Sequence, residues 1–206
     1  EWEQSFARGQ VSGPLKKVGP ARGSGTTIFF RPDREIFDDV RFDPKLIAET
    51  LEAKAYLHGG LTVEFHDETN ATKAVYHYED GLKAYLQKIV AEQKEAPLAG
   101  EVVAIHSTQT DLHLDCALAW TEAVEERVLS YVNSIPTSSG GAHENGLKAG
   151  LVKAVRNYLT VHNLVPRGIT ITAEDVREGG VAVLAIKVPN PQFQGQTKER
   201  LNNAEG

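Results

Sequence analysis

Alternating and continuous apolar runs in the sequence predict a series of β-strands. Leu61–Phe65 and Lys73–Tyr78 alternate apolar and polar residues around a polar turn, which is typical of a hairpin. Val181–Val188 is apolar at nearly every position, which predicts a central strand covered on both faces. The remaining predicted strands are Thr26–Phe30 and segments near residues 101–107, 112–120 and 126–133.

Other segments have the 3.6-residue period of helices. Asp43-Pro44 provides an N-cap and a first-turn proline for a helix that ends at Gly59-Gly60. A short helix is predicted to start at Thr172, where a cap residue precedes acidic residues. Two longer helices are predicted over residues 80–92 and 143–160.

The order of these elements indicates an α+β fold. Hairpins and helices are interspersed after a short N-terminal β segment, so we expect a two-layer α/β sandwich. The first thirty residues are rich in glycine and proline turns, and the segment Asp33–Asp38 is the expected domain boundary.

Composition narrows the class of protein. The chain has 206 residues, of which 41% are hydrophobic, and a net charge of −6, which argues against a surface that coats nucleic acid along its whole length. No apolar run approaches the ~20 residues that cross a bilayer, and no secretory leader is visible. The sequence contains no methionine, and we therefore expect it to be a fragment of a longer subunit.

The single cysteine, Cys116, lies in an apolar run and is predicted to be a buried, inert thiol in a reducing compartment. The seven histidines and this cysteine have no zinc-ligand spacing, so no metal site is predicted in the chain.

A glycine-rich turn, Ser138–Gly141, opens the long helix. Backbone N–H groups at such a turn can bind an anion, although the spacing is not that of a Walker A loop. A simple strand-to-helix turn is the favoured interpretation, and phosphate binding is the alternative.

Basic residues gather on one side of that long helix. At 100° per residue, Lys148, Lys153 and Arg156 fall within 140° of one another, opposite an apolar face. Such a stripe is usually only solvated; the functional alternative is a surface that attracts the DNA backbone.

The polar tail after Val188 holds two further candidates. A loop shaped by proline and glycine carries Gln196 and Lys198 directly after the predicted central strand. A lysine in this position can neutralise a terminal phosphate, although most exposed lysines serve only solubility.

Four motifs, in a fixed order, resemble one known family. They are GTTIFFRPD from Gly25, YVNSIPT with GGAH from Tyr131, EDVREG from Glu174, and PNPQF with GQTK from Pro189. Together they resemble the ATPase-side (B) subunits of bacterial type IIA DNA topoisomerases, DNA gyrase and topoisomerase IV, over essentially the whole chain.

The resemblance implies a domain organisation. Residues 1–34 would be the last strands of a Bergerat-type ATPase domain. Residues 35–206 would be the transducer domain, whose family fold is a two-layer sandwich shared with small-molecule kinases and a ribosomal small-subunit protein.

The resemblance also implies roles for single residues. Thr26 matches a threonine beside the adenine, Lys198 the lysine that reaches the ATP γ-phosphate, and Gln196 the glutamine that assists it. The family's general base, magnesium ligand and lid match nothing in this chain, so the fragment alone is expected to be inactive. The family's usual GG-T-H turn reads Gly140-Gly141-Ala142-His143 here, which removes a hydroxyl at the helix start.

The implied function is coupling of ATP binding and hydrolysis to closure of a DNA gate and strand passage. The intact subunit would use ATP and Mg²⁺ and work in the cytoplasm with DNA, the A subunit and a second copy of its own chain. Lys148, Lys153 and Arg156 would line the DNA cavity. Two alternatives stay open at this point: a small-molecule kinase that uses residues 138–141 as its phosphate loop, and a non-catalytic interaction module.

Overall fold

The computed structural model describes residues 1–93, 96–98, 100–165 and 167–203. It divides into two compact units, Glu1–Pro44 and Lys45–Gly206. The last residues of the expected transducer range, 204–206, lie outside the described part. The domain boundary expected between residues 34 and 35 stays a prediction.

The first unit contains four strands of two residues each. β1 (Trp2–Glu3) pairs with β4 (Lys16–Lys17), and β2 (Phe6–Ala7) pairs with β3 (Gln10–Val11). Arg8, in the turn between β2 and β3, forms ion pairs with Asp33 and Glu35. These ion pairs connect the segment around Asp33 and Glu35 to the turn of the β2–β3 hairpin.

The strand predicted over Thr26–Phe30 is not observed. The segment has no regular secondary structure, and the side chains of Ile28 and Phe29 are 81% and 83% exposed. High β-propensity forms a strand only when a neighbouring strand accepts its hydrogen bonds. No described strand pairs with this segment, so the prediction was wrong.

The second unit begins with a helix and a hairpin, as predicted. α1 (Pro44–Leu57) starts at the first-turn proline, and β5 (Thr62–Asp67) pairs with β6 (Thr72–His77). The Tyr56 ring of α1 stacks on Tyr78 and Tyr85, with centroid distances of 3.6 and 4.7 Å. This stack connects α1 to the hairpin and to α2 (Gly81–Gln93).

A five-stranded sheet forms the centre of the unit, in the order β10-β9-β11-β8-β7. β11 (Gly180–Lys187) is the middle strand; it runs antiparallel to β8 (Leu112–Trp120) and parallel to β9 (Arg127–Val132). The outer strands are β7 (Val103–Gln109) and β10 (Ile135–Pro136). The predicted central, covered strand is therefore confirmed.

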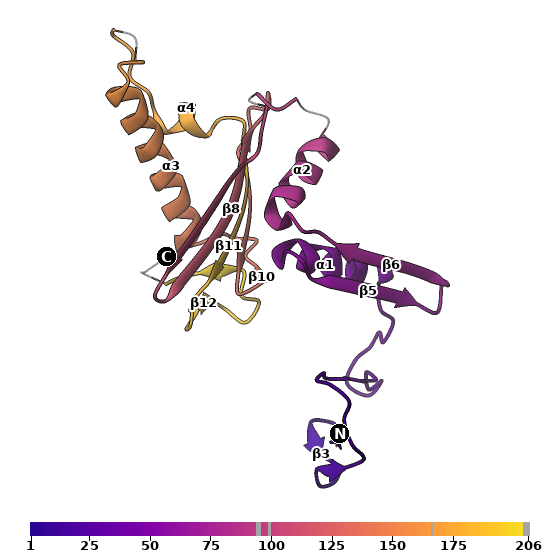
Figure 1. Cartoon of the computed structure of the whole chain (residues 1–206). Helices are drawn as coiled ribbons and strands as arrows, with labels where there is room; N and C mark the ends of the chain where they lie inside the picture. The colour runs from indigo at the N-terminus through magenta and orange to yellow at the C-terminus, as the bar shows by residue number, and fades with distance from the viewer. Residues whose placement is uncertain (94–95, 99, 166, 204–206) are drawn as a thin grey trace. The chain divides into compact units, whose positions relative to one another are not determined.

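Helices cover both faces of this sheet (Figure 1). Ala117 and Val183 face α2, whereas their neighbours Cys116 and Leu184 face α3 (Ala142–Val161), because successive side chains of a strand point to opposite faces. The expected two-layer sandwich is thus corrected to three layers. A strand that is apolar on both faces needs cover on both.

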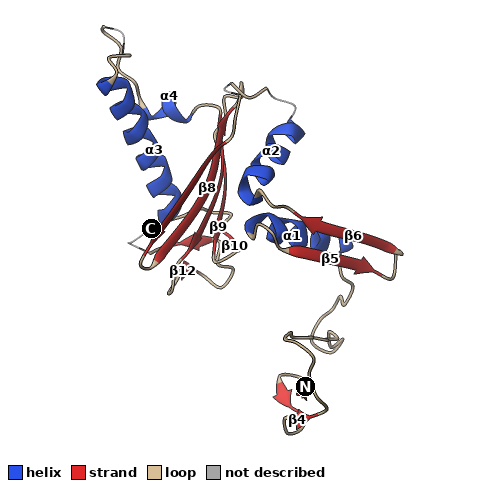
Figure 2. Ribbon diagram, in the orientation of Figure 1, coloured by secondary structure: helices blue, strands red, loops and turns tan. Residues whose placement is uncertain are grey.

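Two small elements complete the second face (Figure 2). α4 (Ala173–Arg177) packs against α3 and starts with a capping box between Thr172 and Asp175, as predicted. The tail forms a short hairpin of β12 (Phe193–Gln194) and β13 (Arg200–Leu201), which the sequence did not predict. Among the described helices, none has the length and apolar character of a membrane span.

Candidate functional site

The tail hairpin carries two of the predicted site residues. Gln196 and Lys198 lie in the loop between β12 and β13, and both side chains are exposed. Gly195 and Lys198 both have left-handed backbones, with φ of +74° and +58°. A lysine keeps this conformation only where the surrounding structure fixes it. The loop therefore has a defined shape.

The Lys198 ammonium group has no hydrogen bond or ion pair with any described residue. An exposed, uncompensated ammonium is a mobile point charge that fits a phosphate group. The residues present therefore fit the expected role toward a terminal phosphate. Gln196, two positions earlier in the same loop, is also exposed, and its side-chain amide is a hydrogen-bond donor.

Backbone hydrogen bonds dock this hairpin against the glycine-rich turn. The Ser139 amide donates to the Glu199 carbonyl at 2.9 Å, and the Leu201 amide donates to the Gly140 carbonyl at 3.1 Å. Arg200 Nη1 adds a 3.0 Å bond to the Ser139 carbonyl. The loop with Lys198 is therefore attached to the start of α3.

Two amides of the turn already have hydrogen-bond partners and are not available to an anion. The amides of Ser139 and Gly140 already donate to Glu199 and Thr137 carbonyls, and both glycines are buried. The kinase-like alternative with a phosphate loop at 138–141 is therefore disfavoured. The N-cap of α3 is Gly141, which has no side chain to cap the helix, and Ala142 at the first helical position carries no hydroxyl.

A buried polar cluster lies beneath the turn. Ser130 Oγ is 2.6 Å from both Thr137 Oγ1 and Glu144 Oε1, and Thr137 Oγ1 is 3.0 Å from His143 Nε2. His143 is 5% exposed, and its Nδ1 atom has no hydrogen-bond partner among the described residues. Burial lowers the pKa of His143, partly opposed by Glu144. The cluster fixes β9 and β10 to the first turn of α3.

The structure brings the three predicted DNA-facing residues to one groove. A groove of about 480 Å³ between α3 and α4 is lined by Lys148, Lys153 and Arg156, with Arg177 from α4. Lys153 and Arg156 are exposed, and Arg156 Nε also donates to the Ile171 carbonyl at 3.0 Å. The basic stripe is therefore a concave surface.

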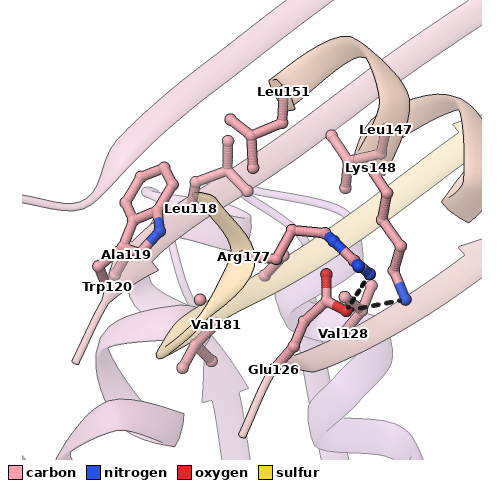
Figure 3. A pocket seen from close by; sticks show the side chains of 12 residues that line it. Leu118, Ala119, Trp120, Glu126, Val128, Leu147, Lys148, Leu151, Arg177 and Val181 are labelled. Atoms are coloured by element: carbon pink, nitrogen blue, oxygen red, sulfur yellow. Dashed lines mark hydrogen bonds and ion pairs between the residues drawn. The ribbon is translucent and has the colours of Figure 1, made fainter. Parts of the chain in front are cut away.

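Two of these cations are already compensated. Glu126 Oε2 forms ion pairs with Lys148 Nζ and Arg177 Nη1, each at 3.2 Å (Figure 3). Glu144 Oε2 lies 3.8 Å from Lys148 Nζ. The same groups line a cavity of about 20 Å³ against the apolar side chains of the sheet. Lys148 is thus less available to an anion than its position on the helix suggested.

Thr26, the residue predicted beside the adenine, lies in the first unit. It is exposed and belongs to the irregular segment described above. Its proposed role stays a prediction.

The cysteine lies inside the core, as predicted. Cys116 is 1% exposed, and burial raises its pKa to about 12, so the buried thiol is confirmed. Within the described ranges, no group of three or more His, Cys, Asp or Glu side chains is arranged to hold a metal ion.

Sequence reasoning missed three residues that shape these sites: Leu201, Glu126 and Arg177. Leu201 lies in a polar tail, yet it is 1% exposed and packs into the core. An isolated leucine among polar residues is the only feature that could have pointed to it. The Glu126–Arg177 pair joins positions 51 residues apart, which no local pattern predicts.

Comparisons with known proteins agree on one family. The family model of DNA gyrase B matches residues 81–206. The B subunit of DNA topoisomerase 4 from Pseudomonas aeruginosa is 39% identical, over 100% of this chain and 33% of that protein. The B subunit of DNA gyrase from Chlamydia pneumoniae is 35% identical, over 99% and 26%. The chain thus spans between a quarter and a third of the length of these relatives.

Solved structures give the same result. The 43K ATPase domain of Thermus thermophilus gyrase B, in complex with an aminocoumarin, superposes with a TM-score of 0.81 at 31% identity, over 99% of this chain and 55% of that one. The topoisomerase IV ATP-binding domain of Francisella tularensis, in complex with a small-molecule inhibitor, has a TM-score of 0.78 at 31% identity, with the same coverage.

Proposed function

Because this chain belongs to the DNA gyrase B family, the B subunits of type II topoisomerases, we propose that it serves as the transducer of such a subunit. In this role it couples ATP binding and hydrolysis to closure of a DNA gate and to strand passage. Residues 35–206 would form the transducer, and residues 1–34 would belong to the ATPase domain that precedes it.

One observation carries the proposal: the exposed ammonium of Lys198, which has no partner among the described residues, lies on a loop that is docked to the turn before α3. ATP, when bound to the intact subunit, supplies a terminal phosphate whose charge a lysine can compensate. Lys198 would bind that phosphate, Gln196 would assist, and Thr26 would lie on the adenine side. The resemblance implies a Mg²⁺ ligand in the ATPase domain, at a position that has no match in this chain.

This contact makes the domain arrangement depend on the nucleotide. Lys198 gains a charged partner only while the γ-phosphate is present, so the engaged arrangement binds ATP more tightly than the disengaged one. Such a difference in affinity is what a conformational switch requires. Loss of the phosphate releases the lysine and the segment that carries it.

The basic groove supports the proposed coupling to a DNA gate. Lys153 and Arg156, with Lys148 and Arg177 behind them, present positive charge on a concave surface of an otherwise acidic chain. We propose that this groove contacts the DNA backbone inside the gate, without reading its sequence. The working assembly would contain two B subunits and the A subunits in the cytoplasm.

Calorimetry tests the nucleotide role. ATP would be titrated into this chain and into a version extended upstream through the ATPase domain. We expect binding only to the extended protein, weakened by Lys198→Ala and unchanged by Lys73→Ala, a matched exposed lysine on β6. Equal affinity of the two variants would remove the role of Lys198. Tight binding to the chain alone would favour the kinase-like alternative.

The DNA role is tested by charge reversal in the intact subunit. Arg156→Glu is expected to reduce the stimulation of ATP turnover by DNA more than turnover without DNA. Equal effects on both rates would show that the groove does not face DNA. A non-catalytic interaction module predicts that neither Arg156→Glu nor Lys198→Ala changes turnover.

A further inference from the structure

We propose that Gly141 is a positioning residue for Lys198: it lets the tail hairpin lie directly on the backbone of the turn, and thereby sets where the lysine loop projects. The proposal rests on the function proposed above for Lys198. It assigns the double glycine to the placement of a phosphate-binding lysine and not to phosphate binding itself.

The first observation is the closeness of two backbones. Gly141 and Leu201 form an isolated parallel β-bridge. A Cβ atom built on Gly141 would lie 2.6 Å from the Leu201 nitrogen and 2.9 Å from its Cα, distances that real Cβ atoms do not adopt. The φ of Gly141 is +143°, which side chains rarely allow. Only glycine therefore permits this contact.

The second observation is that Leu201 cannot move further into the core to make room for a side chain at position 141. Leu201 is 1% exposed and packs into the cluster that includes Val132, Leu184 and Ile186. Close-packed side chains shift little without loss of contacts. A methyl group at position 141 could therefore not press Leu201 further into the sheet, and it would instead move β13 away from the turn.

The third observation links β13 to the lysine. Leu201 pairs with Phe193 across the hairpin, and the five-residue loop between the strands contains Lys198. The Ser139–Glu199 and Leu201–Gly140 hydrogen bonds flank the contact on both sides of the turn. Because the loop is short and anchored at both strands, displacement of β13 is transmitted to Lys198.

A displacement of about 1 Å at a site that must meet a phosphate lowers turnover by up to about a hundredfold. We therefore expect Gly141→Ala in the intact subunit to lower ATP turnover by about ten- to a hundredfold. Gly150→Ala is the matched control, since it places the same methyl group on the same helix where, beyond the adjoining helix backbone, no described atom lies within 4 Å. It should leave turnover unchanged.

A double-mutant cycle separates positioning from general damage. If Gly141 acts through Lys198, Gly141→Ala should lower turnover in the wild-type background and cause no further loss in the Lys198→Ala background. Losses that multiply would overturn the proposal. If Lys198→Ala alone has no effect on turnover, the proposed function itself fails, whatever Gly141 does.

Hydrogen exchange of the chain supplies a readout that does not depend on activity. The amides of Ser139 and Leu201 donate across the contact. Both should exchange at least about tenfold faster in Gly141→Ala, while amides in the middle of β11 keep their protection. Unchanged exchange at both amides would overturn the docking argument.

A milder variant covers the case in which Gly141→Ala does not fold. Arg200→Ala removes the exposed side chain that donates to the Ser139 carbonyl and leaves Leu201 in the core. Faster exchange at the Ser139 amide, with a smaller loss of turnover that again disappears in the Lys198→Ala background, would support the proposal. Normal exchange and normal turnover would contradict it.

Discussion

Neutralising Glu126 should weaken the fold and strengthen DNA binding at the same time. Its carboxylate forms ion pairs with Lys148 and Arg177 at 3.2 Å, and the side chains of Glu126, Lys148 and Arg177 are 22%, 30% and 29% exposed. Glu126→Gln removes the negative charge that two half-buried cations share, and only Lys148 keeps a second carboxylate, Glu144, nearby. The same change releases these cations toward the groove that Lys153 and Arg156 also line.

The expected loss in the free energy of unfolding lies between the values known for exposed and for fully buried ion pairs. Exposed pairs contribute about 0.2–1 kcal/mol, and loss of one partner from a fully buried pair costs about 3–5 kcal/mol. For side chains at this depth we expect a loss of about 1–2 kcal/mol in the free energy of unfolding. In a chain of this length, such a loss lowers the melting temperature by about 2–8 °C.

Two measurements check the prediction: thermal unfolding, and anisotropy of a labelled DNA duplex over a range of salt concentrations. If Lys148 and Arg177 each gain a phosphate contact, the plot of log affinity against log salt should steepen by up to about 1.8. Glu125→Gln is the matched control, because it makes the same change of net charge at the adjacent exposed position. Equal steepening in both variants, or none in Glu126→Gln, would refute the reasoning.

Three further predictions concern the core. Leu86→Ala should cost about 2–5 kcal/mol in urea unfolding, because Leu86 is fully buried between α2 and the sheet; a cost as small as that of the exposed control Leu46→Ala would contradict the packing. Cys116 should resist a thiol reagent at pH 8 until the protein is denatured, and rapid native labelling would show that it is accessible. Burial lowers the pKa of His143 in the folded state, so below about pH 6.5 the unfolded chain takes up a proton that the folded chain does not. The free energy of unfolding should therefore decrease as the pH is lowered through this range, and His143→Gln should flatten the profile.

Periodicity in the sequence was enough for most elements of the second unit. The first-turn proline at position 44 and the glycines after Leu57 defined α1, and alternation defined β5 and β6. The doubly apolar pattern of β11 correctly placed it in the middle of the sheet. These features are local, because backbone preference and burial pattern act within a few residues.

The failures share a different cause. Thr26–Phe30 has the composition of a strand, but a strand also needs a partner, which composition does not provide. Lys148 lies on the basic face of its helix as projected, yet Glu126 and Glu144 compensate its charge. The outcome depended on a strand partner that Thr26–Phe30 lacks among the described strands, and on the distant Glu126 beside Lys148.

In the candidate site, too, the local motifs could be read from the sequence, whereas contacts between distant residues could not. The sequence alone supplied the motifs, the exposed lysine loop and the glycines, because each is a short run of residues with recognisable chemistry. Only the tertiary structure showed which residue Gly141 contacts. Gly141 lies 60 positions before Leu201, and their contact exists because Leu201 is buried in the core. Contacts of this kind depend on packing across the whole domain, so no local pattern contains them.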